Sequence, residues 1–450
     1  MSQRSLDSQF VRMTEKRLEP LIIKLAIPTI ISMLISSVYN MADTYFVGKI
    51  GTSATAAVGV SFSLMAMIQA IGFFFGHGSG NFISRAMGKQ EYQSANTMAS
   101  VGFYSAIFGG LCITIAGLIF LEPLALLLGS TRTILPYACD YMKYILIAAP
   151  FMTGSFALNN QLRFQGRATY AMIGITSGGV LNMILDPIFI FKFNMGTAGA
   201  AVATMVSQMI GFSILLIMVL KKGIPVKPSY FKFRGYYFKE MLRGGLPSLA
   251  RQGCGSIATL CLNNVAGAYG DPAIAAVSVV SRIVMFAYSA LIGYGQGFQP
   301  VCGVNYGAGR YDRVRKAFWF CVRSSFAVQL ILSVLGFVFA KPLVGLLRDD
   351  PEVIAIGVRV LRFQCVTFPM AGYVVFCNMM SQTIGMAVRA TLLALSRQFL
   401  FFVPAIFALE ALFGLAGLEG AQALADICSF AVSLPIGLGI LKEMKHSTIM

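Results

Sequence analysis

Charged side chains are scarce in this chain of 450 residues, in which Asp, Glu, Lys and Arg together make up only 12%. Soluble domains carry about 25% of such residues. Hydrophobic residues make up 57% of the chain, and its mean hydropathy is +0.74. The composition therefore excludes an ordinary soluble domain and indicates an integral membrane protein.

Motifs for enzymatic chemistry are also missing. The chain has two histidines, and its nine cysteines form no CxxC pair or Cys/His cluster, so neither a zinc site nor a disulfide framework is indicated. The glycine-rich runs GHGSG and GYGQG lack the GK[ST] that holds a nucleotide. We expect no enzyme and no cofactor. If the protein performs energy-dependent work in the membrane, an ion gradient must supply the energy, because no site for nucleotide hydrolysis is evident. His77, in the first run, is expected to be solvated at the cytoplasmic end of a helix.

Long apolar runs are what the chain contains. Twelve of them are long enough to cross a hydrocarbon core of about 30 Å. They are continuous rather than alternating, so they predict helices, which satisfy their own backbone hydrogen bonds, and not barrel strands. We predict an all-α integral membrane fold with twelve transmembrane helices. The runs lie near 20–47, 53–79, 95–120, 133–160, 168–191, 196–220, 243–268, 272–300, 316–340, 353–378, 388–409 and 418–441.

Basic residues predict the orientation. With a cytoplasmic N-terminus, the cytoplasmic side collects twenty-two Lys and Arg residues, Arg163 among them, and the outside collects five. This asymmetry fits the positive-inside rule, and twelve spans then place both termini in the cytoplasm. No cleavable signal is evident before the first run. The net charge of +17 is spread over many short loops, which favours contact with anionic headgroups of the lipid bilayer over nucleic acid.

The two halves of the chain resemble each other. A shift of 219 residues aligns GTSATAAVGV (51–60) with GDPAIAAVSV (270–279), and the same shift pairs Pro28 with Pro247. Because each copy holds six spans, both copies enter the membrane from the same side, as parallel repeats do.

This repeat predicts the domain organisation. We expect an N-terminal lobe at 1–221, a basic cytoplasmic linker at 222–242 and a C-terminal lobe at 243–450. Two pseudo-symmetric bundles of six helices are typical of alternating access around a site held between them, although a channel or a structural protein can also be duplicated.

Two carboxylates fall inside apolar helices of the first lobe. The equivalent position of each in the second copy of the repeat holds an apolar residue. Asp43 lies in YNMADTYFVG, and Asp186 follows Asn182 by four residues, on the same helix face. A carboxylate near the membrane centre costs roughly 2.5–3.5 kcal/mol, so it should be paired, protonated or bound to an ion. If their helices pack together, these three residues and Thr204 can converge on one small cation, and the two carboxylates can share a proton.

The alternative for both acids is structural. Asp43 and Asp186 would then cap helix ends, or pair with a loop lysine such as Lys49 or Lys192.

Asp426 lies within a helix of the second lobe. It would either contact a cationic drug or form a structural pair with Arg251, Arg282 or Arg397, and we favour the pair. Buried arginines in this lobe would equally fit an anionic substrate. In the first lobe, Gln208 extends the polar stripe that contains Thr204 and is a candidate for substrate binding.

Several segments together resemble the multidrug and toxin extrusion (MATE) family of transporters over essentially the whole chain, and most closely its DinF-like branch and MepA-like group. They are YNMADTYFVGKIG, LRFQG at 162–166, LNMILDPIF followed by GTAGAAVAT, and the specific motif GQGFQPVCGVNYGAG at 295–309. The NorM-like branch has a glutamate in the seventh helix, whereas PSLARQGCGS at 247–256 has none.

The resemblance implies twelve helices, a V-shaped cleft and export of organic cations and amphipathic drugs in exchange for H⁺ or Na⁺. It implies a cation site with Tyr39 and Tyr141 nearby, a first helix that bends at Pro28, and a drug contact at Asn159. Asn378 is a further candidate for substrate binding, and for both asparagines a polar network that braces the helices is an equal alternative. The implied cation ligands are Asp43, Asn182, Asp186 and Thr204.

From the residues and this resemblance we predict a proton-coupled antiporter in a prokaryotic plasma membrane, acting as a monomer. The alternatives are a Na⁺-coupled exporter and a lipid-linked oligosaccharide flippase of the same superfamily, in which second-lobe arginines would hold a pyrophosphate.

Overall fold

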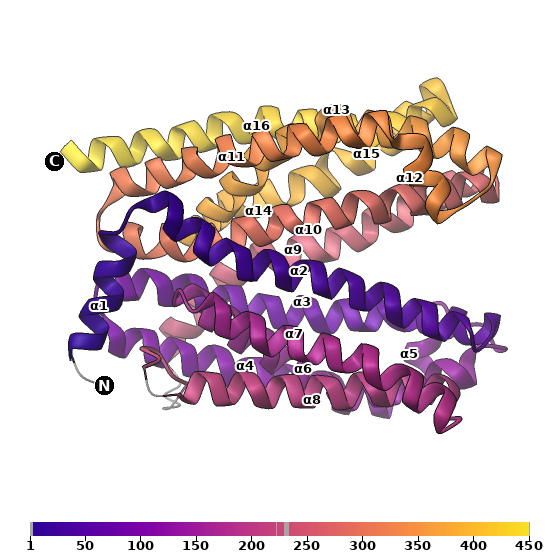
Figure 1. The fold of residues 1–450 in the computed structure, drawn as a ribbon, viewed down its shortest axis with the longest axis horizontal. Helices are drawn as coiled ribbons and strands as arrows, with labels where there is room; N and C mark the ends of the chain where they lie inside the picture. Colours follow the sequence, from indigo (N-terminus) through magenta and orange to yellow (C-terminus); the bar gives the residue numbers. More distant parts are fainter. Residues whose placement is uncertain (1–2, 222, 229–233, 450) are drawn as a thin grey trace.

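The computed structural model describes residues 3–221, 223–228 and 234–449, and every regular element in these ranges is helical (Figure 1). Residues 222 and 229–233 of the predicted linker lie outside the described residues. Within the described part, twelve helical segments have at least 25 residues. They are α2 (Leu18–Gly48), α3 (Thr52–Gly88), α4 (Tyr92–Ile119), α6 (Leu135–Phe164), α7 (Ala168–Pro187) with the π-helical turn η1 (Ile188–Lys192), α8 (Gly196–Leu220), α9 (Gly235–Gly267), α10 (Asp271–Gly307), α11 (Tyr311–Val338), α13 (Pro351–Ile384), α14 (Ala387–Leu395) with η2 (Ser396–Leu400) and α15 (Phe402–Phe413), and α16 (Leu415–Ile449).

These twelve segments correspond to the twelve predicted runs, so the all-α membrane fold is confirmed. Ten of them, by length and composition, are apolar enough to cross a membrane. The other two, α6 and α9, have 30 and 33 residues and are more polar. Three short helices complete the described part: α1 (Gln3–Thr14) precedes α2, α5 (Leu121–Leu127) lies between α4 and α6, and α12 (Ala340–Leu347) lies between α11 and α13.

The long helices form two bundles that lie side by side (Figure 1). The first bundle consists of α2, α3, α4, α6, α7 and α8, and the second consists of α9, α10, α11, α13, α14–α15 and α16. The bundles meet where α2 packs on α10 and where α3 packs on α9 and α10.

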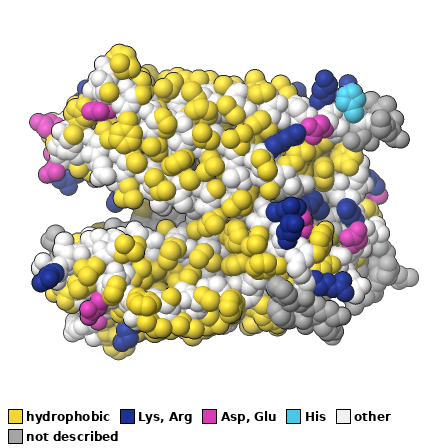
Figure 2. All heavy atoms as spheres, turned by 180° about the vertical axis from the view of Figure 1, so that it is seen from behind, with side chains coloured by type: hydrophobic (Ala, Val, Ile, Leu, Met, Phe, Trp, Pro, Cys, Tyr) yellow, Lys and Arg dark blue, Asp and Glu magenta, His cyan; other side chains and the backbone are white. Residues whose placement is uncertain are grey.

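The hydrophobic core shows where the bundles are joined. One cluster at the end that holds the chain termini contains residues of both bundles, such as Ile83 and Phe376. Away from that end, the first bundle has its own core around Tyr141, and the second has one around Phe402. Figure 2 shows a hollow between the bundles at the end away from the termini. The molecule is therefore closed at one end and open at the other.

Glycines allow the close contact at the closed end. A Cβ atom at Gly78 would overlap the backbone of Met241 on α9, and one at Gly297 would overlap the backbone of Ala26 on α2. Small residues let membrane helices approach closely enough to gain van der Waals contact. The runs GHGSG and GYGQG, which contain these two glycines, thus form helix–helix contacts between the bundles.

Helix α1 lies across the same end and contacts both halves of the chain. Its Gln9 side chain donates to the Gln165 carbonyl of the first half. In the second half, Asn305 Nδ2 donates to the Met13 carbonyl at 3.0 Å, and Arg310 donates to that of Thr14 at 2.9 Å. The closed end is thus held by backbone-directed hydrogen bonds as well as by apolar packing.

We expect Gly297→Val to weaken the contact between α2 and α10, because the added carbons have no space beside Ala26. Overpacking of this kind costs about 1–3 kcal/mol. The measurement is the unfolding temperature of the purified protein in detergent. Gly439→Val is the matched control, because a Cβ there meets no atom within 4 Å. Equal unfolding temperatures for both variants would contradict the close contact.

Candidate functional site

The polar residues that the sequence places inside the first-bundle helices lie together in the structure. Asp43 on α2 and the Asn182–Asp186 pair on α7 are buried, with exposed fractions of 3% or less. Asn182 Nδ2 donates to Asp186 Oδ1 at 3.2 Å and to the Thr204 hydroxyl of α8 at 3.2 Å. The charges of Asp43 and Asp186 act on each other. Three helices therefore supply one polar cluster, as the sequence predicted.

Two tyrosines border this cluster. Tyr141, which is fully buried, lies beside Thr204, and its hydroxyl also approaches the Met65 sulfur at 3.9 Å. Tyr39 lies one turn before Asp43 on α2 and interacts with both carboxylates. On α7, the helix changes to a π-helical turn directly after Asp186 and Pro187. Such turns often mark functional sites in helices.

Several oxygens of the cluster have no hydrogen-bond partner. They are Oδ1 of Asp43, Oδ1 of Asn182 and Oδ2 of Asp186. Within the described part of the chain, neither Asp43 nor Asp186 forms an ion pair, so the predicted alternative of pairing with Lys49 or Lys192 is wrong. Lys49 instead lies over the Tyr45 ring. Buried carboxylates without partners are costly, and a proton or a small cation with oxygen ligands would satisfy them.

A series of cavities runs from this cluster to the second bundle. The first cavity has about 370 Å³ and is lined by Tyr39 and Gln208. The next, with about 250 Å³, shares Phe156 with the first and is also lined by Asn159. The third, with about 280 Å³, shares Arg251 with the second. The cavities thus border one another in a series that begins within the first bundle and ends on the second.

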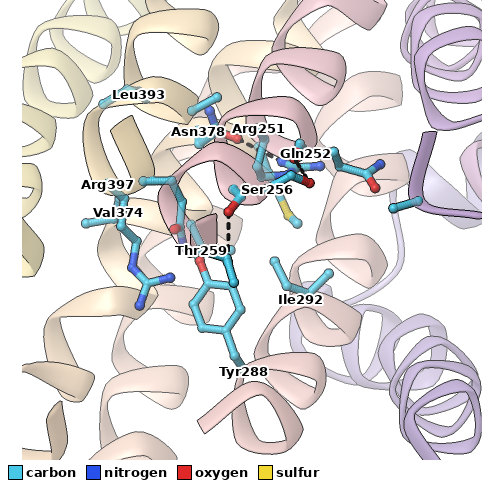
Figure 3. A pocket seen from close by; sticks show the side chains of 16 residues that line it. Arg251, Gln252, Ser256, Thr259, Tyr288, Ile292, Val374, Asn378, Leu393 and Arg397 are labelled. Atoms are coloured by element: carbon cyan, nitrogen blue, oxygen red, sulfur yellow. Dashed lines mark hydrogen bonds between the residues drawn. The ribbon is translucent and has the colours of Figure 1, made fainter. Parts of the chain in front are cut away.

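The third cavity is shown in Figure 3, and α9 forms one of its walls, opposite residues of α10, α13, α14 and η2. Arg251, Gln252, Gly255, Ser256 and Thr259 follow one face of this helix. This polar stripe was not predicted from the sequence, although its spacing of three and four residues is the signal of one helix face.

Asp426 lies close to this cavity and does not line it. Its carboxylate accepts from Arg397 Nε at 2.8 Å, from Gln422 at 3.0 Å and from the Thr367 hydroxyl at 3.3 Å. The structure therefore places Asp426 in the ion pair that the sequence analysis favoured over a drug contact.

The two asparagines predicted to touch substrate make matching contacts. Asn159 Nδ2 donates to the Ala171 carbonyl at 2.9 Å, and Asn378 Nδ2 donates to the Ala390 carbonyl at 2.7 Å. The 219-residue shift of the repeat relates Asn159 to Asn378, and it also relates Ala171 to Ala390. Each asparagine therefore braces two helices of its own bundle while it also lines a cavity.

Three further polar residues are buried although the sequence did not predict that they would be. The expectation that His77 is solvated is wrong: it is 2% exposed and lies 3.1 Å from the Ser248 hydroxyl, because α3 continues to Gly88. Arg163, predicted at the cytoplasmic face, is 1% exposed because the end of α6 is covered by the second bundle, where Arg163 meets Gln299. Glu419 is buried and pairs with Arg359 at 2.7 Å.

Comparison with known proteins decides the family. The MatE family model matches residues 28–188 and 247–408, which are most of both halves of the chain. The chain belongs to the MatE family. Members of this family are membrane transporters, so the prediction of a MATE transporter rather than an enzyme is confirmed.

Individual MATE proteins are similar over nearly the full length. The multidrug export protein MepA of Staphylococcus aureus strain MSSA476 is 27% identical over 419 residues, or 92% of each chain. MepA of Staphylococcus saprophyticus is 26% identical over 417 residues, again 92% of each chain. A solved MATE transporter of the MOP superfamily, in an outward-facing conformation, is 25% identical with a TM-score of 0.91, covering 97% of this chain and 98% of the other.

We expect Arg397→Gln in this MATE protein to lower the free energy of unfolding by about 3–5 kcal/mol, because it leaves the buried Asp426 carboxylate without a counter-charge. The double variant Arg397→Gln/Asp426→Asn should recover most of this loss. Thermal unfolding in detergent measures both effects.

The control is Arg389→Gln, which breaks an exposed pair with Glu443 and should cost less than about 1 kcal/mol. If the double variant were no more stable than Arg397→Gln, the ion pair would not be the reason for the loss.

Proposed function

We propose that this MATE transporter is a multidrug exporter that exchanges organic cations and amphipathic drugs for protons by alternating access. The observation that carries the proposal is the buried cluster of Asp43, Asn182, Asp186 and Thr204, which contains three oxygens without a hydrogen-bond partner. Its neighbour Tyr39 lines the first cavity. The relatives named multidrug export protein support the substrate class.

Helix α2 can couple the cluster to the movement of the bundles. It carries Asp43 and packs on α7 of the first bundle and on α10 of the second. Protonation of Asp43 and Asp186 removes the charge that holds their surroundings apart, so that α2 repacks, bending at Pro28. Proton and drug need not contact the same atoms, because coupling requires only that each favours a different state of one element.

The moving units in this proposal are the lobes 1–221 and 243–450, joined by the linker at 222–242. The cleft would contact drugs through soft and aromatic side chains such as Phe62, Phe73 and Met65. Such surfaces re-pack around different ligands, and aromatic rings attract cations.

The orientation follows from the positive-inside rule. Both termini lie at the closed end (Figure 1), and that end would face the cytoplasm of a prokaryotic cell. The hollow in Figure 2 would then open to the outside, so that the protein is in a drug-releasing state. One chain contains the whole cleft, in keeping with a monomer.

We expect ethidium transport in reconstituted vesicles to be driven by an imposed pH gradient and to fall to background in Asp43→Asn and in Asp186→Asn, because an asparagine cannot bind and release a proton. Transport is followed by ethidium fluorescence, without and with Na⁺.

Asp140→Asn is the matched control, because Asp140 is exposed on α6. Undiminished transport in both cluster variants would overturn the coupling role of the carboxylates. Transport driven only by a Na⁺ gradient would favour the Na⁺-coupled alternative, in which the same oxygens hold the cation. No transport of any organic cation would favour a lipid-linked oligosaccharide flippase.

A further inference from the structure

The cleft between the bundles has an unusual charge. None of the residues that line its three cavities is an Asp, a Glu or a Lys. The arginines that line these cavities are Arg251 and Arg397, and both belong to the second bundle. A cleft that serves only cations would be expected to carry the opposite sign.

The two arginines differ in how their charges are balanced. Arg397 pairs with Asp426 and lies over the Tyr288 ring, 4.5 Å from its centroid. Arg251 forms no ion pair with any described residue, and its hydrogen bond goes to a neutral acceptor, Oδ1 of Asn378, at 3.3 Å. A guanidinium has five N–H donors, so this single long bond leaves most of them available.

Nearby charges increase the positive potential at Arg251. The guanidinium of Arg163 is close enough for the two charges to repel. Among the described residues, the hydrogen bonds of Arg163 go to the neutral side chains of Asn160 and Gln299. An uncompensated cation inside a membrane protein is costly unless a bound group balances it. Figure 3 shows Arg251, Gln252 and Ser256 on the α9 wall of the cavity, where the Gln252 amide adds donors beside the charge and the Ser256 hydroxyl donates to the Gln252 backbone carbonyl at 3.3 Å.

We propose that Arg251 is the binding site for an anionic group, most simply a carboxylate, of an amphipathic substrate that also carries a cation. This inference rests on the proposed export function and specifies its substrate class. Arg is suited to this role because its planar guanidinium donates two parallel hydrogen bonds to a carboxylate.

The substrate would lie across the cleft. Its aromatic cation would contact the rings of Phe156 and Tyr39 in the first bundle, and its carboxylate would reach Arg251 in the second. The central cavity shares Phe156 with the cavity of the first bundle and Arg251 with the cavity of the second bundle, so the path between the two sides is continuous. Zwitterions would thereby be bound at both ends, and simple cations at one.

Two matched dyes test the proposal. Rhodamine 110 carries a xanthylium cation and a free carboxylate, and rhodamine 123 is its methyl ester, which lacks the negative charge. The measurements are the affinity of each dye for the purified full-length protein, by fluorescence polarisation, and the export of each dye from reconstituted vesicles. The variants are Arg251→Gln, Arg251→Lys and the control Arg282→Gln, which removes an exposed arginine of the second bundle that lines none of the three cavities.

In Arg251→Gln we expect rhodamine 110 to bind about tenfold more weakly or worse, since a hydrogen-bonded ion pair is lost. Rhodamine 123 should bind more tightly, because a repelling charge is removed. Arg251→Lys should fall between Arg251→Gln and the wild type, and Arg282→Gln should match the wild type for both dyes.

Equal losses for the two dyes in Arg251→Gln would overturn the proposal, since they would mean that Arg251 only braces Asn378. Unchanged affinity for both dyes would overturn it as well. If the wild type exported rhodamine 123, and Arg251→Gln left the binding and export of rhodamine 110 unchanged, the anion site would be disproved while the multidrug function would stand. If wild type bound and exported neither dye, the proposed multidrug function would fail, and the anion site with it.

Discussion

A charge held inside a bilayer must be balanced, and this constraint explains most of the polar architecture. Asp43, Asp186 and Asp426 are buried away from water, and Arg251 lines the cleft with one neutral hydrogen-bond acceptor, so a counter-charge, a proton or a bound ion stabilises each of them. Asp426 has its arginine, whereas the two first-bundle acids and Arg251 have no charged partner within the described residues. Among the residues of the polar cluster and of the cavity lining, the charges without a charged partner are thus divided between the bundles, with the Asp43 and Asp186 carboxylates in the first and the Arg251 guanidinium in the second.

The closed end allows these charges to lie beside a cleft without destroying the fold. Glycines such as Gly78 and Gly297 bring the bundles into backbone contact at one end, and the separate cores around Tyr141 and Phe402 keep each bundle intact at the other. Each bundle has its own core at the open end, while the closed end joins the bundles through close glycine contacts and one shared apolar cluster. Movement between two states would therefore repack the shared cluster and leave the two separate cores intact.

The sequence was sufficient for the fold and for much of the polar cluster. Continuous apolar runs and the 219-residue repeat predict twelve helices, and the spacing of Asn182 and Asp186 predicts their shared face. His77 and Arg163 were placed wrongly because the apolar runs end before the helices do: polar side chains continue α3 and α6 into the contact between the bundles. Glu419 was missed because its partner, Arg359, lies 60 residues away on another helix. Hydropathy locates the lipid-facing part of a helix, but burial by a second bundle requires the tertiary structure.

The charge of the substrate also affects how export is driven. One proton exchanged for a monocation moves no net charge and gains only about 1.4 kcal/mol per pH unit. A zwitterion that binds both to the first-bundle rings and to Arg251 is neutral overall, so one proton exchanged for it carries one charge inward. The membrane potential then adds about 2.3 kcal/mol per 100 mV. A guanidinium in the cleft would therefore do more than select substrates: it would favour those for which a single proton provides both components of the gradient.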